Sequence, residues 1–171
     1  MNLNIKTILT IIVIGIVAFA FSACSSKPNS AKTNQTSTVG NLDKITPGNE
    51  VSLNNEIAQI PVSEFAKSSV RFYNIKLSGK TIYFLIVKDQ KGIYHAAANA
   101  CKVCFGTMKG FHSEGNEIVC NNCGNRYPFE KIATEKGGCN PGPINANVPV
   151  KNGNLTIKGS ELSQISDLFL N

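Results

Sequence analysis

The sequence contains few arginines and no basic run, which argues against a nucleic-acid-binding protein. Arg71 and Arg126 are its only arginines, and the lysines that bring the formal net charge to +6 are scattered along the chain. Nucleic-acid-binding surfaces gather positive charge into a patch or stripe, so we expect no nucleic-acid partner. We expect the lysines to form a solvated surface, and attraction to anionic lipid stays open as an alternative.

The sequence also lacks an apolar run long enough for a comfortable membrane span. The longest run, residues 8–21, follows Lys6 and ends in Phe21-Ser22-Ala23-Cys24. Its length suits the apolar region of a secretory signal peptide. The ending resembles a bacterial lipoprotein signal, with Phe21 in place of the usual leucine. The resemblance implies a signal peptide over residues 1–23 and lipid on Cys24. An uncleaved anchor helix is the alternative, and both place the remaining chain outside the cytoplasmic membrane.

Large apolar residues are nearly absent from the segment that follows. Residues 25–49 are rich in Ser, Thr, Asn, Lys and Gly. Such a segment buries too little surface to offset its ordering entropy. We therefore expect residues 24–50 to form the lipidated cysteine and a disordered tether, and residues 51–171 to form one domain.

The pattern of that domain predicts a mostly β fold. Strands are predicted at 55–62, 70–77, 81–87, 93–97 and 117–119. The run 81–87 is continuously apolar, so it should lie centrally in a sheet. Asn152-Gly153 predicts a hairpin between 148–151 and 155–158, and a short helix is expected over 160–169. Short strands separated by Gly and Asn turns favour a small sandwich or barrel.

Two Cys-x-x-Cys pairs dominate the chemistry of the chain. Cys101–Cys104 and Cys120–Cys123 are separated by fifteen residues, and Cys139 follows after fifteen more. Four thiolates from two hairpin loops could close around one metal ion or hold an iron–sulfur cluster. We predict the four pair cysteines as metal ligands. Disulfides or thiol redox chemistry are the alternative, which five cysteines after Cys24 disfavour because they cannot all pair. Cys139 could be a fifth ligand, a cap over the centre or a redox thiol.

Several other chemistries find no support. Neither pair is followed by histidine, so covalent haem attachment is not indicated. No βαβ pattern surrounds either pair, which disfavours a thioredoxin-like oxidoreductase. No second cluster of reactive side chains exists, so we predict no catalytic residues and expect an electron-transfer component rather than an enzyme with its own substrate. His95 is expected to be an ordinary strand histidine, with a role as ligand or hydrogen-bond partner the less favoured alternative. His112 lies between the pairs and could replace one thiolate, which is also the less favoured interpretation.

The order of motifs from Gly115 to Ile157 resembles the cluster half of a Rieske domain. By this resemblance Cys101 and Cys120 match the cysteine ligands, and Cys104 and Cys123 stand where Rieske proteins have histidines. The segment around Cys139 matches the loop that covers the cluster. The resemblance implies a Rieske-like fold and a [2Fe–2S] cluster, and the extra thiolates should lower its reduction potential.

Residues 94–144 are still more similar to the FtrD-like family of membrane-associated proteins. The shared elements are Cys-x-x-Cys-x-Gly at 101–106, Cys-x-x-Cys-Gly-Asn-Arg-Tyr at 120–127 and Gly-Gly-Cys-Asn-Pro at 137–141. This resemblance implies an iron–sulfur centre and a partner that is a redox protein or an iron-transport membrane protein. It places the protein in the cell envelope, on the outer side of the cytoplasmic membrane or in the periplasm. Many members carry several membrane spans, which this chain lacks.

The export signal favours a different metal. Residues 1–7 contain no twin arginine, so export of a folded, cofactor-loaded protein is not indicated. A chain exported unfolded must acquire its metal outside, which is easier for zinc than for an iron–sulfur cluster. We favour the lipid-anchored iron–sulfur electron-transfer protein. A zinc-stabilised binding lipoprotein without a redox role and a thiol–disulfide redox protein stay as alternatives.

Overall fold

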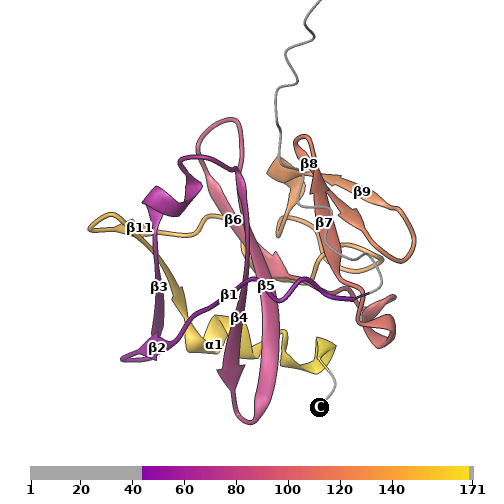
Figure 1. Ribbon diagram of the computed structural model, residues 1–171, viewed down its shortest axis with the longest axis horizontal. Coiled ribbons are helices and arrows are strands. Elements are labelled where there is room, and N and C mark those ends of the chain that lie inside the picture. The colour runs from indigo at the N-terminus through magenta and orange to yellow at the C-terminus, as the bar shows by residue number, and fades with distance from the viewer. Residues whose placement is uncertain (1–43, 170–171) are drawn as a thin grey trace, which may run out of the picture. The chain divides into compact units, whose positions relative to one another are not determined.

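A computed structural model describes residues 44–169 of the chain (Figure 1). The signal peptide predicted at 1–23 and the lipidation predicted at Cys24 lie outside the described residues. Within the described range, no helix is long and apolar enough to cross a membrane.

A five-stranded sheet forms the middle of the described structure. Its strands, in spatial order, are β1 (Asn49–Glu50), β4 (Val70–Leu77), β5 (Lys80–Lys88), β6 (Tyr94–Ala98) and β10 (Pro143–Asn145). β1 pairs with β4 in parallel, and the other pairs are antiparallel. β5 is the central strand, as its apolar run predicts, and β4 has the predicted bounds.

A second sheet contains the predicted C-terminal hairpin. Its order is β11 (Val150–Lys151), β12 (Asn154–Lys158), β3 (Ile57–Pro61) and β2 (Leu53–Asn54). Asn152 and Gly153 both have positive φ, 49° and 75°, so the turn between β11 and β12 has the conformation that Asn-Gly favours. The hairpin prediction is confirmed.

A third, smaller sheet carries the second cysteine pair. It consists of β7 (Phe111–Glu114), β8 (Glu117–Cys120) and β9 (Arg126–Pro128), all antiparallel. In Figure 1 these strands are drawn in orange beside the central sheet.

The central sheet has a hydrophobic core on each face. Ile82, Phe84 and Ile86 of β5 pack in one core with residues of β3, β12 and the C-terminal helix. Leu85 and Val87, which point to the opposite face, pack in a second core with Phe111 and Ile118 of the third sheet. The mostly β prediction is confirmed, and among the described strands the sheets stack without closing into a barrel.

Helical structure is short. The single α-helix among residues 44–169 is α1 (Gly159–Ser163), and the 3₁₀ turns are η1 (Val62–Phe65), η2 (Phe105–Thr107), η3 (Phe129–Lys131) and η4 (Ser166–Leu168). The predicted helix at 160–169 is therefore divided into α1 and η4. Glu161 stabilises the start of α1, because its Oε2 accepts the Lys158 N–H at 2.8 Å.

The packed chain begins earlier than the sequence predicts. The Ile45 N–H donates to the Met108 carbonyl at 2.8 Å, and the Val51 N–H donates to the Asn74 carbonyl at 2.9 Å. We call residues 45–51 the strap. Gly48 has φ +66°, and a Cβ there would stand 2.0 Å from the Phe72 carbonyl oxygen, so the strap lies too close to β4 for another residue. Residues 45–50, which the sequence analysis assigns to the tether, are therefore packed against the sheet.

Candidate metal centre

The first cysteine pair lies in the connection between two sheets. β6 of the central sheet ends at Ala98, and the chain passes through Cys101, Cys104 and η2 before it enters β7 of the third sheet. The Cys104 N–H donates to the Cys101 Sγ at 3.2 Å, which turns the chain around that sulfur. The sequence predicts that the first pair lies in a hairpin loop. In the structure this pair instead lies in the connection between the central sheet and the third sheet.

The second pair occupies the predicted hairpin turn. Cys120 is the last residue of β8, and its N–H donates to the Asn125 carbonyl at 2.9 Å. The Gly124 N–H donates back to the Cys120 carbonyl at 2.9 Å. Gly124 has φ +74°, a conformation that residues with a Cβ rarely adopt. The turn therefore places Cys120 and Cys123 on the same side of the loop.

Cys139 comes from a third segment, the loop between η3 and β10. Gly137 and Gly138 precede it with φ of +90° and +61°. After Cys139 the loop is bound to the end of β6, because the Ala98 N–H donates to the Gly142 carbonyl at 2.7 Å and the Gly142 N–H donates to the Ala100 carbonyl at 2.9 Å. These two hydrogen bonds hold Cys139 close to the residue that precedes Cys101.

The sulfur atoms of all five cysteines lie close together in one cluster. The Cys139 Sγ lies 2.9 Å from that of Cys123, 3.5 Å from that of Cys101 and 3.6 Å from that of Cys104. The Sγ atoms of Cys104, Cys120, Cys123 and Cys139 lie within 4.8 Å of one another. The two pairs thus share one centre, with Cys139 inside it. Which four sulfurs would bind a metal stays a prediction.

Two sulfurs of the pairs accept a hydrogen bond from an N–H group. The Cys104 N–H donates to the Cys101 Sγ at 3.2 Å, and the Asn122 Nδ2 donates to the Cys104 Sγ at 3.4 Å. At Cys120 and Cys123, nearby backbone N–H groups act to lower the pKa, against the effect of burial. The sulfur of Cys139 instead contacts other thiols. Hydrogen bonds from N–H groups stabilise a thiolate, so the pair sulfurs are better prepared to bind a cation.

Burial opposes ionisation of most of these thiols. It raises the pKa of Cys120 to about 11, although the backbone N–H groups lower it in part, and it raises the pKa of Cys101 for the same reason. Burial together with the neighbouring thiols raises the pKa of Cys139. For Cys123, burial is outweighed by the hydrogen bond from Cys139 and the Asn125 N–H, which bring its pKa below the ordinary value. A bound metal must therefore displace protons from the buried thiols.

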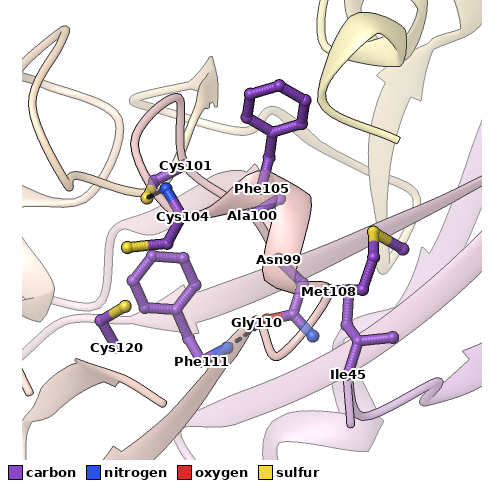
Figure 2. Close-up of a pocket in the computed structure, with 10 residues that line it drawn as sticks. All are labelled: Ile45, Asn99, Ala100, Cys101, Cys104, Phe105, Met108, Gly110, Phe111 and Cys120. Atoms are coloured by element: carbon purple, nitrogen blue, oxygen red, sulfur yellow. Dashed lines mark hydrogen bonds between the residues drawn. The ribbon is translucent and has the colours of Figure 1, made fainter. Parts of the chain in front are cut away.

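Apolar residues and a small cavity lie behind the sulfurs. Cys101 and Cys120 pack in the second core with Phe111 and Phe129, and Tyr127 lies at the edge of this core. Figure 2 shows the Phe111 ring beside Cys104 and Cys120. These residues line a cavity of about 10 Å³, room for one water at most. This cavity cannot hold an organic substrate.

Asn99 is a site residue that the sequence analysis missed. Its side chain is fully buried at the end of β6, two residues before Cys101. The Asn99 Oδ1 accepts the Phe111 N–H at 2.7 Å, the bond drawn dashed in Figure 2, and its Nδ2 donates to the Thr46 carbonyl at 3.2 Å. One amide thus ties the strap, the first cysteine loop and β7 together. The sequence signal that could have indicated this role of Asn99 is its position, as a polar residue between an apolar strand and a cysteine motif.

Both histidines are engaged away from the sulfurs. The His95 Nε2 lies 3.3 Å from the Asp89 Oδ2 in a buried pair. The His112 Nδ1 contacts the Asn121 Oδ1 at 2.5 Å, and its Nε2 contacts the Glu114 Oε1 at 2.9 Å. None of these contacts involves a cysteine sulfur.

The cysteines are chemically suited to iron or zinc. Thiolates are the ligands of iron–sulfur clusters and of structural zinc, and five converge here from three separate segments. The residues present therefore fit a metal centre with sulfur ligands.

Comparison with known proteins gives a family. A search among curated proteins finds no match. The family model described as "Membrane iron-sulfur containing protein FtrD-like" matches residues 65–169, a range that includes all five converging cysteines. Because this match covers more than half of the chain, the protein belongs to the FtrD-like family of membrane iron–sulfur proteins.

Proposed function

We propose that this protein holds an iron–sulfur cluster, a [2Fe–2S] centre, and passes single electrons at the cell envelope. The observation that carries the proposal is the convergence of five sulfurs from three segments, in a family named for iron–sulfur proteins. A cluster of this kind supplies a one-electron couple whose potential depends on its charge and on hydrogen bonds to its sulfurs.

The ligands that we propose are Cys101, Cys104, Cys120 and Cys123. The support is that N–H groups donate to the sulfurs of Cys101 and Cys104, and that backbone N–H groups act to lower the pKa of Cys120 and Cys123, which offsets negative charge. Cys139 has thiols as its sulfur contacts and follows two glycines, so it is the least prepared to hold a metal in a fixed direction. We assign it as the fifth, non-ligating thiol.

The surrounding residues would insulate one side of the centre and expose the other. Phe111 and Phe129 are buried beneath the cysteines and keep water away from the inner sulfurs. Cys123 is exposed, and Val103 in the first cysteine loop is a large apolar side chain with 68% exposure. Electrons would therefore enter and leave past the exposed edge at Cys123, because transfer through this side has the least protein to cross.

We further propose that lipid on Cys24 anchors the protein outside the cytoplasmic membrane. About 20 residues separate Cys24 from residue 45, and a disordered tether of that length, as the sequence predicts, would span about 25 Å. This reach would keep the domain beside the membrane while leaving it free to turn. A redox protein or an iron-transport protein of the membrane is the partner that this arrangement would serve.

A zinc-stabilised binding lipoprotein is the second candidate, because the sulfurs lie close together. A tetrahedral ion with metal–sulfur bonds of about 2.3 Å places its sulfurs about 3.8 Å apart. Cys139 lies 3.5 and 3.6 Å from Cys101 and Cys104, close to this value. One ion would fit with small shifts, whereas a two-iron cluster requires the two pairs to move apart.

A redox titration of anaerobically purified full-length protein tests the proposal. We expect visible absorption that bleaches with dithionite and returns on reoxidation, with one electron taken up per cluster. Cys120→Ser should lack this absorption, while Cys24→Ser should retain it because residue 24 is not a proposed metal ligand. A colourless protein that contains zinc and does not respond to dithionite would refute electron transfer.

A further inference from the structure

The site has one thiol more than a four-coordinate centre needs. Five sulfurs converge, and the closest contact is between Cys123 and Cys139, whose Sγ atoms lie 2.9 Å apart. The contacts of Cys139 with Cys101 and Cys104 are longer, at 3.5 and 3.6 Å. Cys123 and Cys139 are therefore the two sulfurs best placed to bond to each other.

Access from solvent favours the same two sulfurs. Cys123 is the exposed thiol of the five, Cys139 is half-buried, and Cys101 is 1% exposed. A reactant as large as a disulfide can reach Cys123 without opening the core. Thiol–disulfide exchange requires such access to the attacked or attacking sulfur.

The backbone around Cys139 allows the small movement that a covalent bond requires. Gly137 and Gly138 precede it, both are exposed, and a Cβ added to either would meet no atom within 4 Å. Cys123 is likewise followed by Gly124, whose surroundings are open. Cys101, in contrast, is buried and follows a buried residue, Ala100.

We propose that Cys123 and Cys139 form a reversible disulfide by exchange with a disulfide-bearing oxidant. The Cys123 thiolate attacks the oxidant, forms a mixed disulfide and expels one thiol. The Cys139 thiolate then attacks the Cys123 sulfur, forms the internal disulfide and expels the second thiol. Two protein thiols and one disulfide are converted into one protein disulfide and two thiols, so atoms and electrons balance.

The disulfide would decide whether the centre can hold metal. It leaves Cys101, Cys104 and Cys120, which are too few sulfurs to close a four-coordinate thiolate shell. This consequence rests on the proposed function, whereas the disulfide itself does not. A bound metal would in turn protect Cys123, because its sulfur would then be a ligand.

The test uses the full chain in a non-ionic detergent, freed of metal and reduced, then exposed to oxidised glutathione. After trypsin, Cys139 lies alone in peptide 137–151, and Cys101 and Cys104 lie in 92–102 and 103–109. Cys120 and Cys123 stay together in 110–126, so fragmentation of the linked peptide between these two residues must place the bond at Cys123. We expect a link between 110–126 and 137–151 and the loss of two alkylatable thiols per chain. A link within 110–126, or one that joins 92–102 to 103–109, would overturn the proposal.

Two variants and an experiment with added Zn²⁺ distinguish this inference from the proposed function. Cys139→Ser should abolish the link, and Cys104→Ser, a half-buried neighbour in the same cluster, should keep it. Loading the protein with Zn²⁺ before adding oxidised glutathione should preserve the thiols of Cys123 and Cys139. Oxidising the protein before adding Zn²⁺ should prevent Zn²⁺ uptake.

If the link forms in a protein that never binds iron, the electron-transfer function fails and the disulfide stands. If Cys104→Ser loses the link as fully as Cys139→Ser while remaining folded by circular dichroism, the pairing is wrong.

Discussion

Two buried or half-buried thiols, Cys101 and Cys139, lie close enough that either could occupy the same position in the proposed metal shell. Their Sγ atoms lie 3.5 Å apart, and only Cys101 has a backbone N–H directed at its sulfur by the turn of its own pair. A sulfur held in place before the metal arrives loses less freedom on binding, so it should bind more tightly.

We therefore expect Cys101→Ser to lose most of its metal and Cys139→Ser to retain it. The measurement is metal per chain by elemental analysis after identical anaerobic purification. Because Cys101 is buried, thermal unfolding of both variants must first establish that they fold. The opposite pattern would assign the ligands to Cys104, Cys120, Cys123 and Cys139, the set whose sulfurs lie within 4.8 Å.

Away from the metal centre, Asp89 is a buried carboxylate that should make stability depend on pH. Its Oδ1 accepts the backbone N–H groups of Lys91 and Ile93 at 2.9 and 2.8 Å, and its Oδ2 contacts His95. Burial opposes the charge, but the Ile93 N–H and His95 outweigh it and hold the pKa of Asp89 below its ordinary value. The stabilisation is then complete above the unfolded-state pKa of about 4 and is lost as the pH falls through the folded-state pKa.

Asp89→Asn should lower the free energy of unfolding by about 2 kcal/mol at pH 7, since hydrogen bonds to a charged group are lost. Urea denaturation of both proteins at pH 7 and pH 3 measures this. The difference between them should be smaller at pH 3, which lies below the unfolded-state pKa of about 4, because there the unfolded chain binds the proton before the folded one does. A difference that is equal at both pH values would show that the ionised form contributes nothing.

At the scale of elements, the strap holds the first cysteine loop in place. Asn99 Nδ2 donates to the strap at Thr46, and Asn99 Oδ1 accepts from Phe111 beside the cysteines. Gly110 has to be glycine here, because its φ is +66° and a Cβ would stand 2.6 Å from the Asn99 Oδ1. The strap, this loop and β7 thus depend on one buried amide.

Asn99→Ala should destabilise the protein by about 2–3 kcal/mol, because it leaves the buried Phe111 N–H without its acceptor. Asn74→Ala is the matched control, since Asn74 also donates to the strap, at the Pro47 carbonyl, but in an exposed position. It should cost about 0.5 kcal/mol or less. Chemical denaturation checks both, and equal effects of the two substitutions would contradict the role of Asn99.

The sequence predicts elements whose signals are local. The apolar run of β5, the Asn-Gly turn between β11 and β12 and the strand β4 all follow from the order of neighbouring residues. These predictions are correct because the formation of such a strand or two-residue turn depends little on distant parts of the chain.

Features that depend on distant partners were missed. The first cysteine loop links two sheets, and only the pairing of β6 and β7 with different strands reveals this. The strap has no apolar periodicity, and it is packed through hydrogen bonds to Asn74 and Met108 that spacing cannot show. Cys139 is different, because the sequence analysis already places it near the centre. What the sequence does not show is that its loop is hydrogen-bonded to the end of β6 and to Ala100, about 40 positions away in the chain.

At the scale of the whole molecule, the proposed lipid on Cys24 would keep the metal centre near a membrane. Cys24→Ser should release the protein from the membrane fraction or leave the signal uncleaved, because no thiol remains to accept lipid. Fractionation with intact-mass measurement distinguishes these two results from the wild-type protein. Ser25→Ala, next to the same site, is the control and should stay in the membrane fraction. Unchanged fractionation and mature mass in Cys24→Ser would contradict the anchor.

The central claim is that the five-thiol site binds an iron–sulfur cluster rather than a single zinc ion. Iron, zinc and acid-labile sulfide, measured together on full-length protein purified without oxygen from iron-replete cells, test it most directly. Our account predicts iron and labile sulfide in equal amounts, about two of each per chain for a [2Fe–2S] centre, and little zinc. One zinc per chain with no labile sulfide would contradict it.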